Sequence, residues 1–408
     1  MLTIARTLSV PVLVVITSLL MQSCENSEVG SLYDPNAASP RPQPTVTSIS
    51  PASGLAGVTT ITINGTNFSA VKEENTVYFD KTTAVVLTAS ATQLTVKAPL
   101  LAKDSIQIRV GVFGSDLYST TRLYKLEAAV VEFGSIAKNE EAFGVAADAN
   151  GTVYVGLMTN AVDGSIIRIN PVTGVRQDLA AAVAQRRYIA LKASSDSYLY
   201  ALLEGSSLLL RVPLAGGAVA PYAVLPGLTD VADFDFDATK NIWIGSRSAN
   251  VIGRVTPAKV FRTFPLNMVV RSVRVFNSGL YVAGAVDTVE GVWRAEIVSA
   301  DSLGSFKKYF DLRTLYSTKY QANALTFSSD GWLYLGTSSP DGIVLVAPGG
   351  TSGTPYYETL FKNNVSRFGW GAGPVLFATR PNPSGTTGNS VIYYINTQKT
   401  SSPYHGLQ

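Results

Sequence analysis

The chain has 408 residues, which is enough for two or three domains, and only 15% of them are charged, with a formal net charge of +3. Because no basic stripe accompanies this small charge, the composition argues against a nucleic-acid-binding protein. The sequence has one cysteine, Cys24, and one histidine, His405, which excludes an internal disulfide and a Cys/His zinc site and leaves His405 as the only base for a Ser-His-Asp triad. Frequent Gly and Pro with abundant Tyr and Phe favour β-structure with many turns.

Residues 1–23 predict a secretory signal peptide. Arg6 supplies the positive charge, and the apolar run from Val10 to Met21 is too short for a comfortable membrane span but long enough for a signal-peptide core. The following stretch, LLMQSC, resembles the looser lipobox of Bacteroidota lipoproteins. This resemblance implies cleavage before Cys24 and lipidation of its thiol. A plain signal peptide with an incidental cysteine is the alternative, and the position of the lone cysteine favours lipidation.

Residues 24–43 are polar, rich in Pro, Ser and Asn, and lack hydrophobic periodicity, so they predict a flexible tether behind the lipidated cysteine. Glu25 and Glu28 follow the cysteine closely. Acidic residues in this place resemble the surface-export signals of Bacteroidota lipoproteins, which implies an outer-membrane protein that faces the cell exterior. Ordinary linker acidity is the alternative.

Residues 44–127 alternate apolar and polar positions in short segments separated by turn residues, which predicts half-buried strands. Their regular recurrence suggests a small immunoglobulin-like sandwich. The start of this region resembles an IPT/TIG domain at nine positions: Ile49, Pro51, Gly54, Gly57, Ile61, Ile63, Gly65, Asn67 and Phe68. The resemblance implies a spacer or an interaction module, and the fold alone does not say which.

Residues 128–408 repeat one pattern six times: an apolar strand, a turn, a second strand with an aromatic residue, and a third strand. The aromatic anchors are Tyr154, Tyr200, Trp243, Tyr281, Tyr334 and Phe377. Repeats of roughly 40–50 residues are typical of β-propeller blades, which bury their faces by stacking around an axis. The pattern predicts six blades with the anchors in the core between them. It also predicts the fourth strand of the fifth blade at YYETLFK, residues 356–362.

The segment AVVEFGS, around Val131, precedes the first complete copy. We expect it to form the outer strand of the sixth blade, beside VIYYIN, and to close the ring without an open edge. The copies ADANGTVYVG and SSDGWLYLG resemble NHL repeats, and the region resembles six-bladed NHL and gluconolactonase/regucalcin-like propellers. The predicted fold is therefore all-β, with an immunoglobulin-like sandwich followed by a six-bladed propeller.

Loops that enter the innermost strands of a propeller usually carry its ligand site. These loops offer ten candidates: Glu141, Phe143, Arg187, Tyr188, Asp230, Asp233, Arg271, Asn323, Arg367 and Trp370. Three arginines near one axis need compensating partners. In one interpretation they pair with Glu141, Asp230 and Asp233 around the channel. In the other they contact a ligand directly, and arginines beside aromatic residues suit sugar binding.

Lactonases of the resembled family hold one divalent cation with Glu, Asn and Asp at the inner rim. Asn323 matches the family's Asn segment, and Glu141 lies near its Glu position, although the Gly-Pro that follows there is missing. The Asp position falls on Ala232, with Asp233 one residue away, and such a slip reverses the face of a side chain in a strand. Since Ca²⁺ normally needs six or more oxygen ligands, we expect no cofactor, with Ca²⁺ as a minor alternative.

The order of lipobox, tether, IPT domain and propeller resembles Bacteroidota surface glycan-binding lipoproteins that accompany SusC/SusD-type uptake systems. The resemblance implies a non-catalytic outer-membrane lipoprotein that captures a glycan or another polymer, with SusC/SusD-type proteins as partners. The alternatives are a protein-interaction scaffold of an outer-membrane complex and a metal-dependent, lactonase-like hydrolase.

Overall fold

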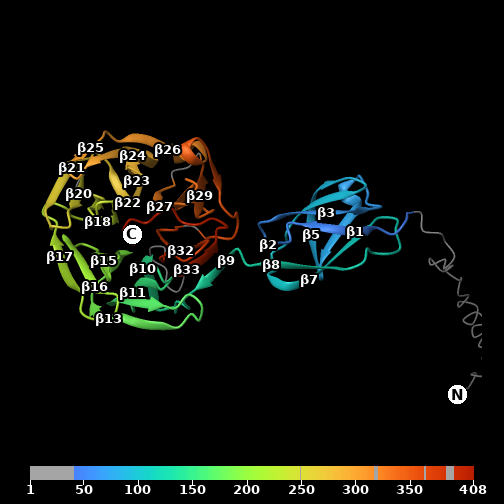
Figure 1. Cartoon of the computed structure of the whole chain (residues 1–408), viewed down its shortest axis with the longest axis horizontal. Helices are drawn as coiled ribbons and strands as arrows, with labels where there is room; N and C mark the ends of the chain where they lie inside the picture. Colours follow the sequence, from blue (N-terminus) through green and yellow to red (C-terminus); the bar gives the residue numbers. More distant parts are fainter. Residues whose placement is uncertain (1–40, 249, 317–319, 363, 383–389) are drawn as a thin grey trace, which may run out of the picture.

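The computed structural model describes residues 41–248, 250–316, 320–362, 364–382 and 390–408. The predicted signal peptide, Cys24 and the tether up to residue 40 lie outside the described residues. The described chain forms two bodies, which are joined by the short stretch between strands β8 and β9 (Figure 1). Within these ranges, no helix has both the length and the apolar character needed to cross a bilayer.

The first body is a sandwich whose two sheets run in the order β1-β3-β6-β5 and β5-β4-β7-β8-β2. Its strands are β1 (Thr45–Ser50), β2 (Ser53–Leu55), β3 (Thr60–Thr66), β4 (Asn75–Phe79), β5 (Thr82–Ala89), β6 (Gln93–Lys97), β7 (Lys103–Val112) and β8 (Arg122–Glu127), with the 3-10 turn η1 (Lys72–Glu74) before β4. The predicted immunoglobulin-like sandwich is confirmed.

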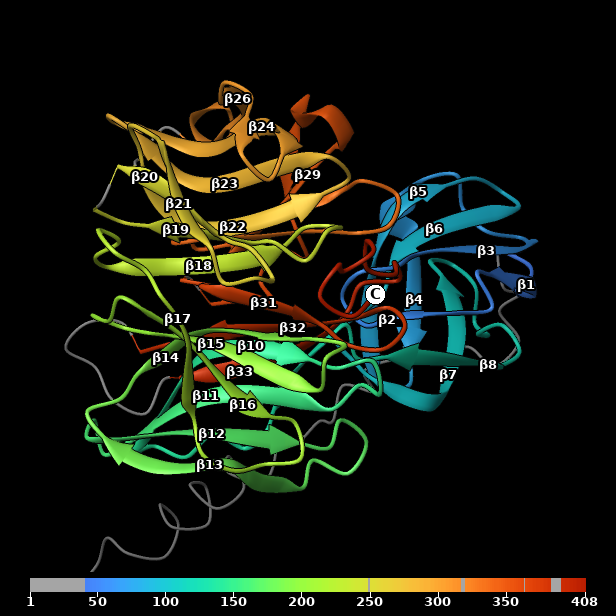
Figure 2. The same cartoon turned by 60° about the vertical axis from the view of Figure 1, so that its left-hand side comes forward.

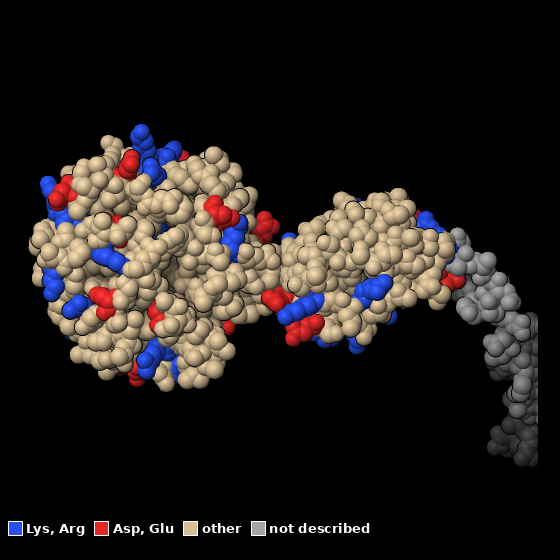
Figure 3. Space-filling model, viewed as in Figure 1, with Lys and Arg blue, Asp and Glu red and all other residues tan. Residues whose placement is uncertain are grey.

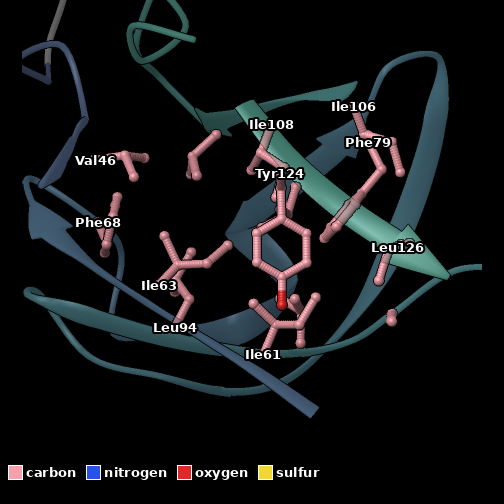
Figure 4. Packing of buried hydrophobic residues seen from close by; sticks show 14 of the residues in the cluster. Val46, Ile61, Ile63, Phe68, Phe79, Leu94, Ile106, Ile108, Tyr124 and Leu126 are labelled. Carbon is pink, nitrogen blue, oxygen red and sulfur yellow. The ribbon is translucent and has the colours of Figure 1, made fainter. Parts of the chain in front are cut away.

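Alternate side chains of these strands fill the space between the sheets (Figure 4). Ile61 and Ile63 are both fully buried, as their spacing in the sequence predicts. Gly65 is required where β3 passes β1, because a Cβ atom there would lie 1.8 Å from the carbonyl oxygen of Thr45. Asn67 follows with a φ of 61°, a conformation that asparagine tolerates, so both residues shape the chain locally.

The second body is a six-bladed propeller, as predicted. Blade 1 holds β10 (Glu140–Ala147), β11 (Val153–Thr159), β12 (Asp163–Ile169) and β13 (Arg176–Ala184). Blade 2 holds β14 (Tyr188–Ala193), β15 (Tyr198–Leu203), β16 (Leu208–Pro213) and β17 (Ala220–Val224). Blade 3 holds β18 (Val231–Phe236), β19 (Ile242–Ser246), β20 (Val251–Val255) and β21 (Phe261–Pro265).

Blade 4 holds β22 (Val269–Phe276), β23 (Gly279–Val286), β24 (Val289–Ser299) and β26 (Lys307–Asp311), with β25 (Ser302–Leu303) extending β24 into a hairpin and η2 (Leu312–Thr314) following. Blade 5 holds β27 (Ala322–Phe327), β28 (Leu333–Thr337), β29 (Ile343–Val346) and β30 (Gly353–Pro355), with η3 (Pro348–Gly350) before β30. Blade 6 holds β31 (Arg367–Trp370), β32 (Val375–Arg380), β33 (Val391–Asn396) and β9 (Val130–Phe133).

The fourth strand of blade 5 differs from the prediction. It is β30, and the predicted segment at residues 356–362 follows it as a connecting loop. Tyr357 and Thr359 have φ values of 46° and 69°, which break an extended strand. The rings of Tyr356 and Tyr357 also stack, with 3.9 Å between their centroids, whereas successive side chains of a strand point to opposite faces.

The anchors predicted for the inter-blade core are all buried, with at most 6% of any of them exposed. In blades 1 to 3 the polar tip of the anchor also donates a hydrogen bond to an aspartate in the preceding turn. The pairs are Tyr154 with Asp148 at 2.9 Å, Tyr200 with Asp196 at 2.7 Å, and Trp243 with Asp237 at 2.9 Å. Each such bond fastens the turn between the first two strands of a blade to its core.

Strand β9 closes the ring as predicted, because it pairs with β33 as the outer strand of blade 6. Val131 lies opposite Tyr394 in this register, and the Asn396 amide donates to the Ala129 carbonyl oxygen at 2.9 Å. Since alternate pairs of an antiparallel ladder exchange hydrogen bonds, Val131 belongs to a bonded pair and Glu132 does not.

Replacing Val131 with proline is expected to lower the free energy of unfolding by about 1–3 kcal/mol, because proline removes a donor from the closing ladder. Glu132→Pro is the matched control and should cost clearly less, since its amide faces away from β33. Urea denaturation of both variants measures the difference. Equal losses would contradict the register described for the closure.

Candidate ligand-binding site

The inner strands β10, β14, β18, β22, β27 and β31 all begin on one face of the propeller, which we call the loop face. Figure 2 shows β18, β22 and β31 running from this face towards the side that holds the C-terminal end. Figures 1 and 3 view that opposite side, where charged residues of both signs are scattered (Figure 3). The predicted site residues at the starts of the inner strands therefore gather on the far side of those two views.

Three ion pairs occupy equivalent positions on the loop face in blades 2, 3 and 4. Each joins the start of the inner strand to the end of the second strand or the start of the third in the same blade. The pairs are Arg187 with Glu204, Asp230 with Arg247 at 2.7 Å, and Arg271 with Glu290 at 2.7 Å. The side chains of the first two pairs are 30–42% exposed, so their donors and acceptors face solvent.

The predicted pairing of arginines with Glu141, Asp230 and Asp233 is wrong in its partners. Arg187 and Arg271 pair with Glu204 and Glu290, which lie 17 and 19 residues further along the chain. The antiparallel strands of a blade explain why each arginine pairs within its own blade, because the start of one strand lies beside the end of the next. The prediction missed three partners: Glu204, Arg247 and Glu290. Each lies 17 or 19 residues after the charged residue it pairs with, and this recurring separation of opposite charges in the sequence could have indicated them.

Blades 1, 2 and 6 meet at a half-buried cluster on the loop face. The guanidinium of Arg187 lies over the ring of Phe143, with its central carbon 4.9 Å from the ring centroid. Glu141 accepts a hydrogen bond from the Asn382 amide at 3.0 Å. Burial raises the pKa of the Glu141 carboxyl, against the opposing effects of that hydrogen bond and of the nearby Arg187 charge. The cluster combines an aromatic ring, a cation and a carboxyl group.

Arg367 bridges blades across the axis. Its guanidinium donates to the carbonyl oxygens of Ile189 at 2.9 Å, Ala232 at 2.7 Å and Ser366 at 2.5 Å. Burial lowers the pKa of Arg367 from its ordinary value, with the charge of Asp233 opposing that effect. The contacts with blades 2, 3 and 6 make Arg367 a structural crosslink near the start of the channel.

The remaining candidates divide between the loop face and other places. Asn323 lies on the loop face and donates to the Asn364 side chain at 3.3 Å. Tyr188 is 1% exposed and packs among the core residues between blades 1 and 2. Trp370 ends β31 instead of starting it, and its indole donates to Thr326 at 2.9 Å. Three residues of strand move it about 10 Å from Arg367 towards the opposite face.

The cation site of lactonase-like propellers is not assembled by these residues. Asp233 is 3% exposed and turns into the interface between blades 3 and 4, where it accepts hydrogen bonds from the Ser272 hydroxyl at 2.6 Å and the Val273 amide at 3.1 Å. The family's Asp position is occupied by Ala232, whose backbone carbonyl oxygen accepts a hydrogen bond from Arg367. Among the described residues, no group of three or more His, Cys, Asp or Glu side chains is placed to hold a metal ion.

The opposite end of the channel is occupied by the C-terminal segment, whose end lies at the centre of the ring in Figure 1. The Ser402 amide donates to the Phe327 carbonyl oxygen at 3.0 Å, and the ring of Tyr404 lies 5.1 Å from the guanidinium carbon of Arg274. The ammonium of Lys240 donates to the His405 carbonyl oxygen at 2.7 Å. These contacts hold the segment across the ends of the inner strands.

The sandwich is identified by comparison with protein families. Residues 44–125 match the IPT/TIG domain. The match covers about a fifth of the chain and agrees with the boundaries of strands β1 to β8. No curated protein matches the sequence.

Solved structures share the fold of the chain at low sequence identity. An auxiliary nutrient-binding protein from Bacteroides thetaiotaomicron is 10% identical, with 89% of this chain and 98% of that one covered and a TM-score of 0.50. A candidate phosphatase from the same organism is 10% identical, with 87% and 97% covered and a TM-score of 0.54. The calcium-binding protein regucalcin from Agrobacterium tumefaciens is 15% identical, with 68% and 96% covered and a TM-score of 0.52. Because these proteins differ in activity, the likeness establishes the fold and leaves function to the site.

Proposed function

We propose that this chain is a non-catalytic cell-surface lipoprotein that binds a glycan at the loop face of its propeller. The observation that carries the proposal is the series of ion pairs in blades 2, 3 and 4. The pairs in blades 2 and 3 are partly exposed and offer N–H donors and carboxylate acceptors while adding little net charge, whereas Arg271 and Glu290 in blade 4 are only 17% and 14% exposed. Such a surface complements the hydroxyl groups of a neutral sugar better than it complements an ion.

The fold shared with a nutrient-binding protein and the predicted lipid anchor support the same proposal. The auxiliary nutrient-binding protein from B. thetaiotaomicron matches this chain over both bodies, so a nutrient-binding protein shares the whole arrangement. Lipidation at Cys24 would hold the chain to the outer membrane, and Glu25 and Glu28 would direct it to the cell exterior. The IPT domain would then separate the propeller from the bilayer, and a SusC/SusD-type system would take up the captured glycan.

A titration of purified protein with a broad panel of oligosaccharides, followed by calorimetry, tests this function. We expect at least one glycan to bind, and the double variant Arg187→Ala/Glu204→Ala to weaken that binding by roughly tenfold or more, since two hydrogen-bonding groups are lost. Lys103→Ala/Asp80→Ala removes an ion pair from the sandwich instead and serves as the matched control. A panel without any binding, or equal losses in both double variants, would refute the proposal.

A protein-interaction scaffold is the second candidate. The loop after β7 exposes Phe113 by 75%, Leu117 by 59% and Tyr118 by 50%, which is unusual for large apolar side chains so close together in sequence. Affinity capture from detergent-solubilised membranes separates the two functions. A stoichiometric protein partner that is lost in a Phe113→Ser/Leu117→Ser variant, together with an empty glycan panel, would favour the scaffold.

A further inference from the structure

Four exposed apolar side chains gather at one end of the sandwich: Val71, Phe113, Leu117 and Tyr118. Phe113 directly follows β7, and its amide donates to the Glu74 carbonyl oxygen at 2.8 Å, so the loop after β7 lies beside the loop that carries Val71. Strand β8 leads into the propeller, and β7 runs antiparallel to it, so β7 ends on the side of the sandwich that faces away from the propeller. We call these four side chains the distal tip.

The chain enters the sandwich at the distal tip. The Arg41 amide donates to the Gly114 carbonyl oxygen at 3.2 Å, and the side-chain amide of Gln43 donates to the Tyr118 carbonyl oxygen at 2.7 Å. Figure 1 shows the described chain beginning at this end of the sandwich, away from the propeller. Sixteen residues separate Arg41 from Cys24, and even at full extension such a connection spans no more than roughly 60 Å. A chain held to lipid at Cys24 therefore keeps the distal tip close to the bilayer.

The side chains behind the tip suit a boundary between lipid and water. The ring of Tyr118 meets that of Tyr78 edge to face, with 5.6 Å between centroids, and the guanidinium carbon of Arg109 lies 5.6 Å from the Tyr118 ring centroid. Arg109 precedes Phe113 by four residues along β7, which places its backbone roughly 13 Å further from the end of the sandwich. Tyrosine is enriched at membrane–water interfaces, and arginine keeps its charge in water while its stem covers apolar surface. From the end of the sandwich inwards, the side chains thus change from apolar to charged.

The loops at the distal tip carry no excess of positive charge. Arg41 pairs with the Glu74 carboxylate at 2.7 Å, and the Lys72 ammonium lies 3.7 Å from the Glu73 carboxylate. Asp116, in the loop after β7, is exposed and adds one negative charge. Attraction to anionic lipid headgroups therefore does not explain a contact at this tip, and burial of its apolar side chains does.

We propose that the distal tip rests on the lipid bilayer, with Phe113 and Leu117 inserted into its interfacial region. The inference rests on the lipid anchor at Cys24, which belongs to the proposed function. A few apolar side chains bury too little area to hold a protein on a membrane by themselves. The anchor turns their contact into an intramolecular event, at an effective concentration on the order of millimolar. Because the propeller follows the opposite end of the sandwich, this contact would direct it away from the bilayer.

Fluorescence quenching by brominated lipid tests the contact. The processed chain, from Cys24 to Gln408, is coupled through its single cysteine to a maleimide-bearing lipid in phosphatidylcholine vesicles with brominated acyl chains. Phe113→Trp places a tryptophan at the distal tip, whereas the four native tryptophans all lie in the propeller. The bromines should quench the added tryptophan at least roughly twofold more strongly than the native ones, because tryptophan prefers the interfacial region.

Leu100→Trp is the matched control, since Leu100 is an exposed side chain in the loop before β7, at the end of the sandwich nearer the propeller. It should add no such quenching. Adding Leu117→Ser to Phe113→Trp should reduce the quenching, and raising the salt concentration from about 0.1 M to about 1 M should not.

Equal quenching of the two tryptophan variants, or quenching that disappears at high salt, would overturn the proposal. Capture of a stoichiometric membrane protein through Phe113, without added quenching, would assign the tip to a protein instead. Since the coupling supplies the lipid chemically, a negative result concerns the tip alone, and the glycan titration tests the loop face separately.

Discussion

Replacing Asp235 with alanine is expected to lower the free energy of unfolding by about 3–5 kcal/mol, because it leaves a buried guanidinium without its carboxylate. The side chains of Asp235 and Arg274 are 0% and 5% exposed and lie 2.8 Å apart, on the inner strands of neighbouring blades. Asp235 also accepts a hydrogen bond from the Val275 amide at 2.8 Å. Chemical denaturation of the variant measures the loss.

Two companion variants identify the cause of that loss. Asp104→Ala breaks the pair with Lys125, in which the aspartate is 88% exposed, and should change stability by less than about 1 kcal/mol. Asp235→Leu combined with Arg274→Met removes both buried charges and should recover part of the stability lost in Asp235→Ala. A double variant that is less stable than Asp235→Ala would show that the guanidinium does not need its partner.

Replacing Trp243 with alanine is expected to destabilise the protein by about 3–5 kcal/mol, through a cavity between blades 3 and 4. Trp243 is fully buried, and its ring lies 5.4 Å from that of Phe264 between centroids. Trp243→Phe is the matched control, since blade 6 uses phenylalanine at the equivalent anchor, Phe377. We expect it to cost less than half as much, because Asp237 keeps its bond from the Asn241 side chain at 2.9 Å. Similar midpoints of urea denaturation for the two variants would contradict the role of the anchor.

The fold could be predicted because its information is local and repeated. Each blade needs a buried aromatic residue at one place in a short hairpin. A single copy of this pattern is a weak indication of a blade, but six copies at similar spacing together predict the propeller. The closing strand could be placed as well, because the last copy has three strands of its own and AVVEFGS is the segment left over. In blade 5 the repeat pattern placed the fourth strand at YYETLFK, residues 356–362, and positive φ values at Tyr357 and Thr359 make that segment a loop instead.

The candidate site could be predicted only in part. The positions of Arg187, Arg271 and Asn323 followed from the starts of the inner strands. Their partners, Glu204 and Glu290, were missed because they carry no hydrophobic pattern of their own, and only their similar separation from the arginines, 17 and 19 residues, could have indicated them. The closure of the opposite end of the channel was missed entirely, since it depends on the C-terminal segment folding back onto strands more than a hundred residues away in sequence, as the contact between Arg274 and Ser402 illustrates.

A crystal structure of the protein with an oligosaccharide that the titration panel has identified tests the location of the glycan site most directly. We expect the sugar on the loop face, with its hydroxyl groups hydrogen-bonded to Arg187 and Glu204 or to Asp230 and Arg247, and with the starts of the inner strands unmoved. Density for the sugar on the IPT domain, or at the C-terminal end of the channel with the loop face empty, would contradict the placement of the glycan site.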